Sequence, residues 1–416
     1  MTRDLRWLVT ILAFTACGEG VMAPGEPAPA PEVAARCTGG FADQFPCDGL
    51  DMVAHVALVD LEPGRQNLSS VNDVWGWTDP VTGTEYALVG RNDGLTIVDL
   101  SDPLSPRPVG RLASPTPSST WRDVKVYADH AYVVADAAPG HGIQIFDLTR
   151  LRGVNAFTEF DEDGRYMGVS SVHNIAIDEE TGFAYSLGNN SGGTTCGGGM
   201  HMLNLANPTN PVFVGCFAQQ GTGRLGTGYT HDAQCVVYRG PDAAHQGREI
   251  CMGSNETAVV ISDVTDKSAP VALGTGRYPD FGYVHQGWLS EDQRFFFQND
   301  ETDEISGIVD RTRMLVWDVT DLDDPILAAQ HFGPTSAVDH NVYVRGNLAY
   351  QANYMFGIRI LDISDPVHPV ERAFFDTVPE RDDGFGGVWS SYPFFDSGVF
   401  VVSSSREGLF VLRLQQ

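Results

Sequence analysis

Long apolar runs are scarce in this sequence. Beyond its N-terminal segment, no stretch reaches the roughly 18 consecutive apolar residues that a membrane-spanning helix needs. Basic residues are also few, because 26 Lys and Arg stand against 54 Asp and Glu and give a net charge of −28. Such a surface repels phosphate, which excludes nucleic acid as a partner. Only 19% of the residues are charged, whereas 45 glycines and 24 prolines indicate the many turns of an all-β protein.

The signatures of several enzyme classes are absent. The chain has no GxSxG nucleophile elbow, no HExxH zinc motif, no P-loop and no GxGxxG after a strand. The CxxC spacing of thiolate metal sites is missing as well. These absences favour a binding role over catalysis. A hydrolase that uses two carboxyl groups, with Glu256 and Glu301 as a candidate pair, would escape such a motif search.

The N-terminus has the pattern of an export signal. Two arginines precede the apolar run Trp7–Phe14, which is too short to cross a bilayer. The run ends in LAFTAC, a pattern that resembles the lipobox of bacterial lipoproteins. We expect residues 1–17 to be a lipoprotein-type signal peptide with lipidation at Cys17. An ordinary signal peptide that is cut near Ala16 or Ala23 is the alternative.

The next segment indicates how the domain is attached. Residues 18–48 are rich in Pro and Ala and predict a tether with a small loop between Cys37 and Cys47. We expect the protein to be exported, as a cell-surface or outer-membrane lipoprotein or otherwise as a periplasmic or extracellular protein. Contact with a membrane is expected only through the lipid anchor.

Six cysteines remain after Cys17, and an even number in an exported chain predicts disulfides. Six cysteines allow 15 pairings in principle. Short separations favour Cys37 with Cys47 and Cys235 with Cys251, because the latter two lie on runs that read as hairpin neighbours. Cys196 with Cys216 then follows by elimination.

One apolar segment that ends in Asp or Asn recurs along the chain. Six copies end at Asp99, Asp147, Asn204, Asp263, Asp318 and Asp362, and a terminal copy has Arg413 at the same place, in steps of 44 to 59 residues. Repeats of this length are typical of propeller blades, and each unit can be read as four short strands. The last unit stops after three strands, whereas the strand-like segment at 52–60 stands alone. We predict a seven-bladed β-propeller over residues 49–416, with the N-terminal strand completing the last blade.

The copies LTIVDLSDP, MLVWDVTD and IRILDISDP, together with HNIAID and DHNVYV, resemble the bacterial LVIVD-repeat proteins and, more closely, the choice-of-anchor B family. The resemblance covers about residues 45–416. It implies a secreted or surface β-propeller and carries over no catalytic residues. The name of that family reflects members that share the domain and differ in how they attach to the cell surface.

Four consecutive units begin their first strand with a histidine: His173, His231, His285 and His340. First strands line the central channel of a propeller, so we expect these imidazoles to converge at one mouth, with Asp232 beside them. Such ligands suit a divalent metal ion, either a transition metal or Ca²⁺. The alternative is a structural ring in which these side chains hydrogen-bond the backbone of the next blade.

Polar side chains at the starts of first strands and in the loops after the second strands should share the face of the histidines. They could bind a protein, a glycan or a small ligand, although such residues also form ordinary turns. The candidates are Asp73, Asp123, Arg91, Asp93, Asn189, Asn255, Glu256, Asp300, Glu301 and Asn353.

Two functions are therefore expected from the sequence. The first is a surface-anchored propeller that acts as a binding or interaction module and is not an enzyme. The second is a metal-assisted hydrolase or lactonase-like enzyme with its site at the histidine-lined mouth of the channel. A purely structural surface component is a third candidate.

Overall fold

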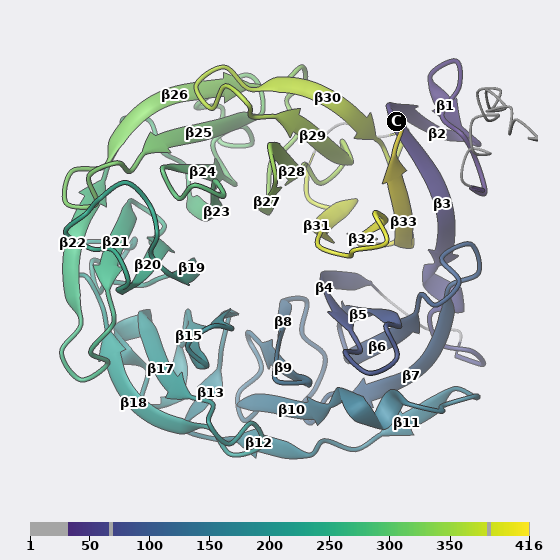
Figure 1. Ribbon diagram of the computed structural model, residues 1–416, viewed down its shortest axis with the longest axis horizontal. Helices are drawn as coiled ribbons and strands as arrows, with labels where there is room; N and C mark the ends of the chain where they lie inside the picture. Colours follow the sequence, from purple (N-terminus) through teal and green to yellow (C-terminus); the bar gives the residue numbers. More distant parts are fainter. Residues whose placement is uncertain (1–31, 66–69, 381–383, 416) are drawn as a thin grey trace, which may run out of the picture. The chain divides into compact units, whose positions relative to one another are not determined.

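The computed structural model describes residues 32–65, 70–380 and 384–415, and its compact unit begins at Val33. In this unit seven sheets are arranged radially about a central axis, as in a seven-bladed β-propeller (Figure 1). The described residues contain only three short 3-10 helices, which are η1 (Leu58–Asp60), η2 (Leu148–Leu151) and η3 (Cys196–Gly198). The predicted all-β class and the blade number are confirmed.

The first three blades each contain four antiparallel strands, which follow one another from the axis outward. Blade one has β4 (Val71–Thr78), β5 (Glu85–Arg91), β6 (Gly94–Asp99) and β7 (Arg107–Ala113), and β11 (Thr158–Phe160) adds a parallel edge strand to β7. Blade two has β8 (Arg122–Tyr127), β9 (His130–Ala135), β10 (Ile143–Asp147) and β12 (Gly164–Tyr166). Blade three has β14 (Asn174–Asp178), β15 (Phe183–Leu187), β17 (Met200–Asn204) and β18 (Val212–Phe217), and a small sheet of β13 (Val169–Ser171) and β16 (Ser191–Gly193) accompanies it.

The next three blades repeat this order. Blade four has β19 (Asp232–Val237), β20 (Glu249–Ser254), β21 (Val259–Asp263) and β22 (Val271–Gly276). Blade five has β23 (Val284–Leu289), β24 (Phe295–Asp300), β25 (Arg313–Asp318) and β26 (Ile326–Phe332). Blade six has β27 (Val342–Arg345), β28 (Leu348–Ala352), β29 (Ile358–Asp362) and β30 (Val370–Phe375).

Blade seven joins the two ends of the described chain. It contains β31 (Val388–Tyr392), β32 (Phe400–Ser404), β33 (Gly408–Leu414) and, outermost, β3 (Leu50–Ala57) from the N-terminal side. The β3 strand pairs with β33 from Leu50 opposite Leu414 to Ala57 opposite Gly408. The predicted closure is therefore present, because strands from both ends of the described chain share one sheet.

The segment just before β3 adds to blade six. Its hairpin of β1 (Phe41–Ala42) and β2 (Phe45–Asp48) lies in the part of the chain that we interpreted as tether and loop. The β2 strand pairs with β30, and a disulfide joins Cys37 to Cys47. This hairpin is thus an extension of the propeller sheet.

The other two disulfides also join the cysteines that the sequence paired. Cys235 and Cys251 lie opposite each other on β19 and β20, and Cys196 links η3 to Cys216 on β18. Disulfides are compatible with an exported protein. The expected signal peptide and Cys17 lie outside the described residues. No helix in the described part of the chain is long and apolar enough to span a membrane.

Two features of the structure explain the repeated sequence motif: the burial of its strand and the turn that follows the strand. The third strands β6 and β21 are buried along their whole length because neighbouring blades pack on both of their faces, whereas the outer strand β26 alternates between exposed and partly buried residues. The Asp that ends the motif accepts a hydrogen bond from the N–H two residues later, at 2.8 Å for Asp99 and 2.9 Å for Asp318 and Asp362. The motif therefore encodes a core strand followed by an Asx turn.

Candidate metal centre at the channel mouth

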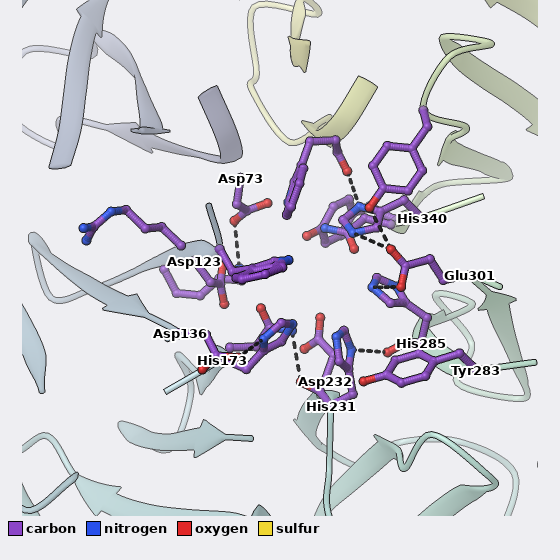
Figure 2. A pocket seen from close by; sticks show the side chains of 18 of the residues that line it. Asp73, Asp123, Asp136, His173, His231, Asp232, Tyr283, His285, Glu301 and His340 are labelled. Carbon is purple, nitrogen blue, oxygen red and sulfur yellow. Dashed lines mark hydrogen bonds and ion pairs between the residues drawn. The ribbon is translucent and has the colours of Figure 1, made fainter. Parts of the chain in front are cut away.

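The starts of the innermost strands and the adjoining loops enclose a cavity of about 260 Å³ at one end of the central channel (Figure 2). Every blade contributes to its lining through residues at or next to the start of its innermost strand. Examples from blades one to seven are Asp73, Asp123, His173, His231, His285, His340 and Trp389.

The four predicted histidines lie side by side along this cavity. The ring centroids of His173 and His231 are 4.4 Å apart, and those of His231 and His285, and of His285 and His340, are each 4.3 Å apart. Figure 2 shows them as an arc that starts near Asp136 and ends near Glu301. The structure thus brings together the four side chains that the repeat register singled out.

Most of these imidazoles use one nitrogen within the fold. His231 Nδ1 lies 2.9 Å from the carbonyl oxygen of His285, and His340 Nδ1 lies 2.5 Å from that of Trp389. A carbonyl only accepts, so each Nδ1 donates its proton and each Nε2 keeps a lone pair. His173 Nδ1 makes the equivalent contact with Asp136, at 2.9 Å. Hydrogen bonds of this kind orient metal-ligating histidines in other proteins.

His285, Glu301 and His340 form the tightest ligand group in the cavity. One ligand atom from each lies within 4.8 Å of the other two. The carboxylate of Glu301 is 3.8 Å from His285 Nε2 and 3.9 Å from His340 Nε2, and it accepts a hydrogen bond of 2.7 Å from the Tyr354 hydroxyl. Two imidazoles and a carboxylate are a common ligand set of catalytic zinc and of non-haem iron. His285 Nδ1 has no hydrogen-bond partner in the described structure.

Burial keeps the imidazoles of His231, His285 and His340 neutral. It lowers the pKa of His340 to about 3 and moves the pKa of His231 and of His285 well below 6.5. The same desolvation raises the pKa of Glu301, and the Tyr354 hydroxyl partly opposes this by stabilising the carboxylate. At neutral pH the histidine lone pairs are therefore available to a cation, which would also favour the charged form of Glu301.

A second cluster in the same cavity contains its own cation, Lys125. Lys125 Nζ lies 2.5 Å from Asp123 and 3.5 Å from Asp73, and 4.5 Å from the centre of the Trp75 ring. Burial alone would lower the pKa of Lys125, but the two carboxylates raise it well above its ordinary value. Asp232, which we predicted beside the histidines, lines the cavity too, and burial together with Asp123 raises its pKa to about 7.

Several other predicted face residues are used within the fold and do not line this cavity. Arg91 is buried in ion pairs with Glu62 and Asp93. Asn189 donates to the carbonyl of Ser186 at 2.9 Å. These contacts correspond to the turn-forming alternative that the sequence left open.

Most of the remaining predicted face residues also make their contacts within the fold. Asn255 donates to Thr222 at 2.9 Å, and Glu256 accepts from the Arg224 N–H at 2.6 Å. Asp300 is buried behind Glu301, where it accepts from the Tyr278 hydroxyl at 2.6 Å and lies 3.6 Å from Arg313. Asn353 is also buried, and its side-chain oxygen has no partner in the described part of the chain.

Sequence reasoning missed the aromatic side chains of the cavity. Tyr229 and Tyr283 line it, and Trp121, Tyr354 and Trp389 do so as well. A signal for the first two exists, because each stands two residues before a cavity histidine in a Gly-Tyr-x-His sequence, at 228–231 and 282–285. Asp136 and Lys125 were missed too, since neither carries a motif.

A further group of metal-compatible ligands lies outside the channel. Ligand atoms of Asp242, His245 and Asp323 lie within 4.8 Å of one another. The Asp323 side chain is 61% exposed, and the three residues make ion pairs and hydrogen bonds with one another and with the backbone of Leu322. This outer group provides a control for weak surface binding of metal.

Two segments of the chain match the model of the LVIVD repeat: residues 81–113 in blade one and 339–377 in blade six. This chain carries LVIVD repeats. They cover β5 to β7 and β27 to β30, so each repeat spans the second to fourth strands of a blade and its Asx turn. None of the curated proteins that were compared matches the chain.

Proposed function

We propose that this propeller is a divalent-metal-dependent enzyme of the hydrolase class, with its metal held by His285, Glu301 and His340. The observation that carries the proposal is the convergence of these three ligand atoms within 4.8 Å in a buried cavity. Two nitrogen donors favour a transition metal over Ca²⁺, which prefers oxygen. Three protein ligands leave coordination positions for water and substrate.

The surroundings of this ligand set support hydrolysis. A bound divalent ion lowers the pKa of a coordinated water and polarises a carbonyl or phosphoryl oxygen. His231 lies beside His285 with a free Nε2, where it can accept the proton of that water or serve as a fourth ligand. The hydroxyl-bearing rings of Tyr229 and Tyr283 line the cavity and can hold the oxygen atoms of a substrate.

A non-catalytic binding module is the second candidate, and it would present the same face to a protein or a glycan. Exposed apolar side chains on that face favour it, because exposed apolar patches mark interaction sites. The two candidates differ in whether the metal site turns over a substrate.

We also propose that the protein is exported and attached to the cell surface of a bacterium by a lipid at Cys17, as in the choice-of-anchor B family. The three disulfides support export. Metabolic labelling with a fatty acid, compared between wild type and Cys17→Ser, tests the anchor. Loss of label in the variant is expected, whereas equal labelling contradicts it.

Hydrolysis is tested on the purified protein with a panel of esters, lactones and phosphate esters. We expect turnover that disappears on dialysis against a chelator, returns on addition of Zn²⁺ or Mn²⁺, and falls at least about 100-fold in Glu301→Gln. Asp323→Asn, in the outer ligand group, should keep wild-type turnover. Turnover that survives the chelator, or its absence across the panel in a metal-loaded protein, contradicts the proposal.

A further inference from the structure

Exposed apolar side chains are unevenly distributed over the described part of the propeller. On the loops of the face that carries the metal centre they include Trp121, Met167, Leu225, Phe281, Ile305 and Phe385. In the loops of the opposite face, Val81 is the one large apolar residue that is exposed among the described residues. Towards that face the first residues of four outermost strands, Val212, Val271, Ile326 and Val370, are also exposed, but they lie at the periphery, away from the axis. Burying apolar side chains is favourable, so an accumulation at one mouth indicates that something apolar covers it.

Several of these side chains lie at or near the cavity, and Phe281 stands two residues before Tyr283 in the cavity wall. Trp121 lines it and is 44% exposed. The ring of Phe385 lies 5.4 Å from that of Tyr354, which holds Glu301. Leu225, 88% exposed, follows Arg224, whose guanidinium lies 4.5 Å from the ring centre of Tyr283 in the cavity wall. We call Trp121, Leu225, Phe281 and Phe385 the apolar rim.

The cavity is small and polar in character. Its volume of about 260 Å³ is below the usual range of ligand pockets, which starts near 300 Å³. Imidazoles, carboxylates and tyrosines line it, so it suits a polar reacting group. Any larger substrate must extend from the cavity mouth across the rim.

We infer that the substrate is an uncharged amphiphile, whose polar carbonyl or phosphoryl group enters the cavity while its alkyl or aryl chain lies on the apolar rim. This inference rests on the proposed function, because it names the substrate class of the same site. The net charge of −28 disfavours anionic amphiphiles and anionic membrane surfaces. The rim is a recognition surface, and its residues take no part in the reaction.

The test uses two hydroxamic acids, which chelate metal through the same head group and differ in chain length. Binding of acetohydroxamic and octanohydroxamic acid to the zinc-loaded protein is followed by the fluorescence of Trp121 and Trp389, which line the cavity, and by calorimetry. If about half of the six additional methylenes are buried on the rim, the octanoyl compound binds roughly 50-fold more tightly. Leu225→Ser with Phe385→Ser should reduce this preference to about tenfold or less and leave acetohydroxamate affinity and zinc content unchanged. Val81→Ser, on the opposite face, is the matched control and should keep the full preference.

The outcomes separate this inference from the proposed function. Equal affinity for the two compounds in zinc-loaded wild type overturns the inference and leaves the metal centre in place. If neither zinc nor acetohydroxamate binds, the proposed function fails. If the octanoyl compound still binds to that metal-free protein, and the rim variant weakens this binding, the apolar rim remains supported. Co-sedimentation of the wild type with phosphatidylcholine vesicles, lost in the rim variant, would show a membrane-docking surface and also overturn the inference.

Discussion

The two polar clusters in the channel cavity differ in how they satisfy their buried groups. Lys125 compensates the charge of Asp123, whereas burial and the neighbouring Asp123 raise the pKa of Asp73 well above its ordinary value. Asp123 also accepts from the N–H of Ile175 in the next blade at 2.8 Å. His231, His285 and His340 instead stay neutral because burial lowers their pKa, and the Nε2 atoms of His285 and His340 lie beside the carboxylate of Glu301. A cluster whose members satisfy one another stabilises a fold, whereas lone pairs left facing a cavity are suited to a ligand.

The same comparison shows how the two interpretations of the histidine register are compatible. Asn174 donates to the carbonyl of His231 at 3.0 Å, and Gln286 accepts from the N–H of Val342 at 2.7 Å. These residues directly follow histidines and form the interblade ring. The Nδ1 atoms of His231 and His340 join that ring as well. The structural role and the proposed metal-binding role would thus use different nitrogens of the same side chains.

The largest effect is expected for Lys125→Met, which leaves two buried carboxylates without their cation. We expect the free energy of unfolding in urea to fall by about 3–5 kcal/mol. Adding Asp123→Asn should restore more than about 1 kcal/mol, because one unpaired charge is then removed. A loss below about 1 kcal/mol in Lys125→Met would mean that the Lys125 cluster does not stabilise the fold.

An intermediate effect is expected from His141, a buried histidine outside the metal centre. Its Nε2 accepts from Arg122 at 2.8 Å and its Nδ1 donates to the Gly142 carbonyl at 3.0 Å, and burial lowers its pKa to about 4. Since the unfolded imidazole gains its proton below pH 6.5, acidification favours unfolding between pH 6.5 and about 4. From pH 7 to pH 5 the wild type should lose about 2 kcal/mol more stability than His141→Gln. Urea titrations at the two pH values in which wild type and His141→Gln lose the same amount of stability would contradict this prediction.

The smallest effect is expected for Gln286→Ala, in the ring position next to His285. Loss of the bond to Val342 should lower the free energy of unfolding by about 1 kcal/mol and leave the bound metal unchanged. Urea titration and elemental analysis on one preparation check both parts. A variant that folds and loses its metal would show that ring and metal centre are not separable.

Much of the fold could be predicted from the sequence because its repeat is local. Six copies of the motif place a strand before an Asx turn and the seventh, terminal copy is a strand alone, so the seven copies predict seven blades. The closure by β3 followed from counting strands in the last unit. The hairpin β1–β2 could not be predicted in the same way, because it is not part of a sequence repeat. Its pairing with β30 also joins segments more than 300 residues apart.

The candidate site was predictable only where it follows the repeat. The four histidines share one register position, which the sequence shows directly. Glu301 was one of ten face candidates, and nothing in its loop distinguishes it from Glu256, which faces the Arg224 backbone. Asp136 lies 37 positions before His173 in the chain, and only the curvature of the propeller brings the two together.

Metal content of the purified protein tests the central claim most directly. Wild type, His285→Ala with His340→Ala, and Asp323→Asn should be offered Zn²⁺, Mn²⁺ and Fe²⁺, dialysed, and analysed by mass spectrometry. The account predicts about one equivalent of transition metal in wild type and in Asp323→Asn, and none in the folded double variant. A folded wild type without metal, or a double variant that retains it, would contradict the account.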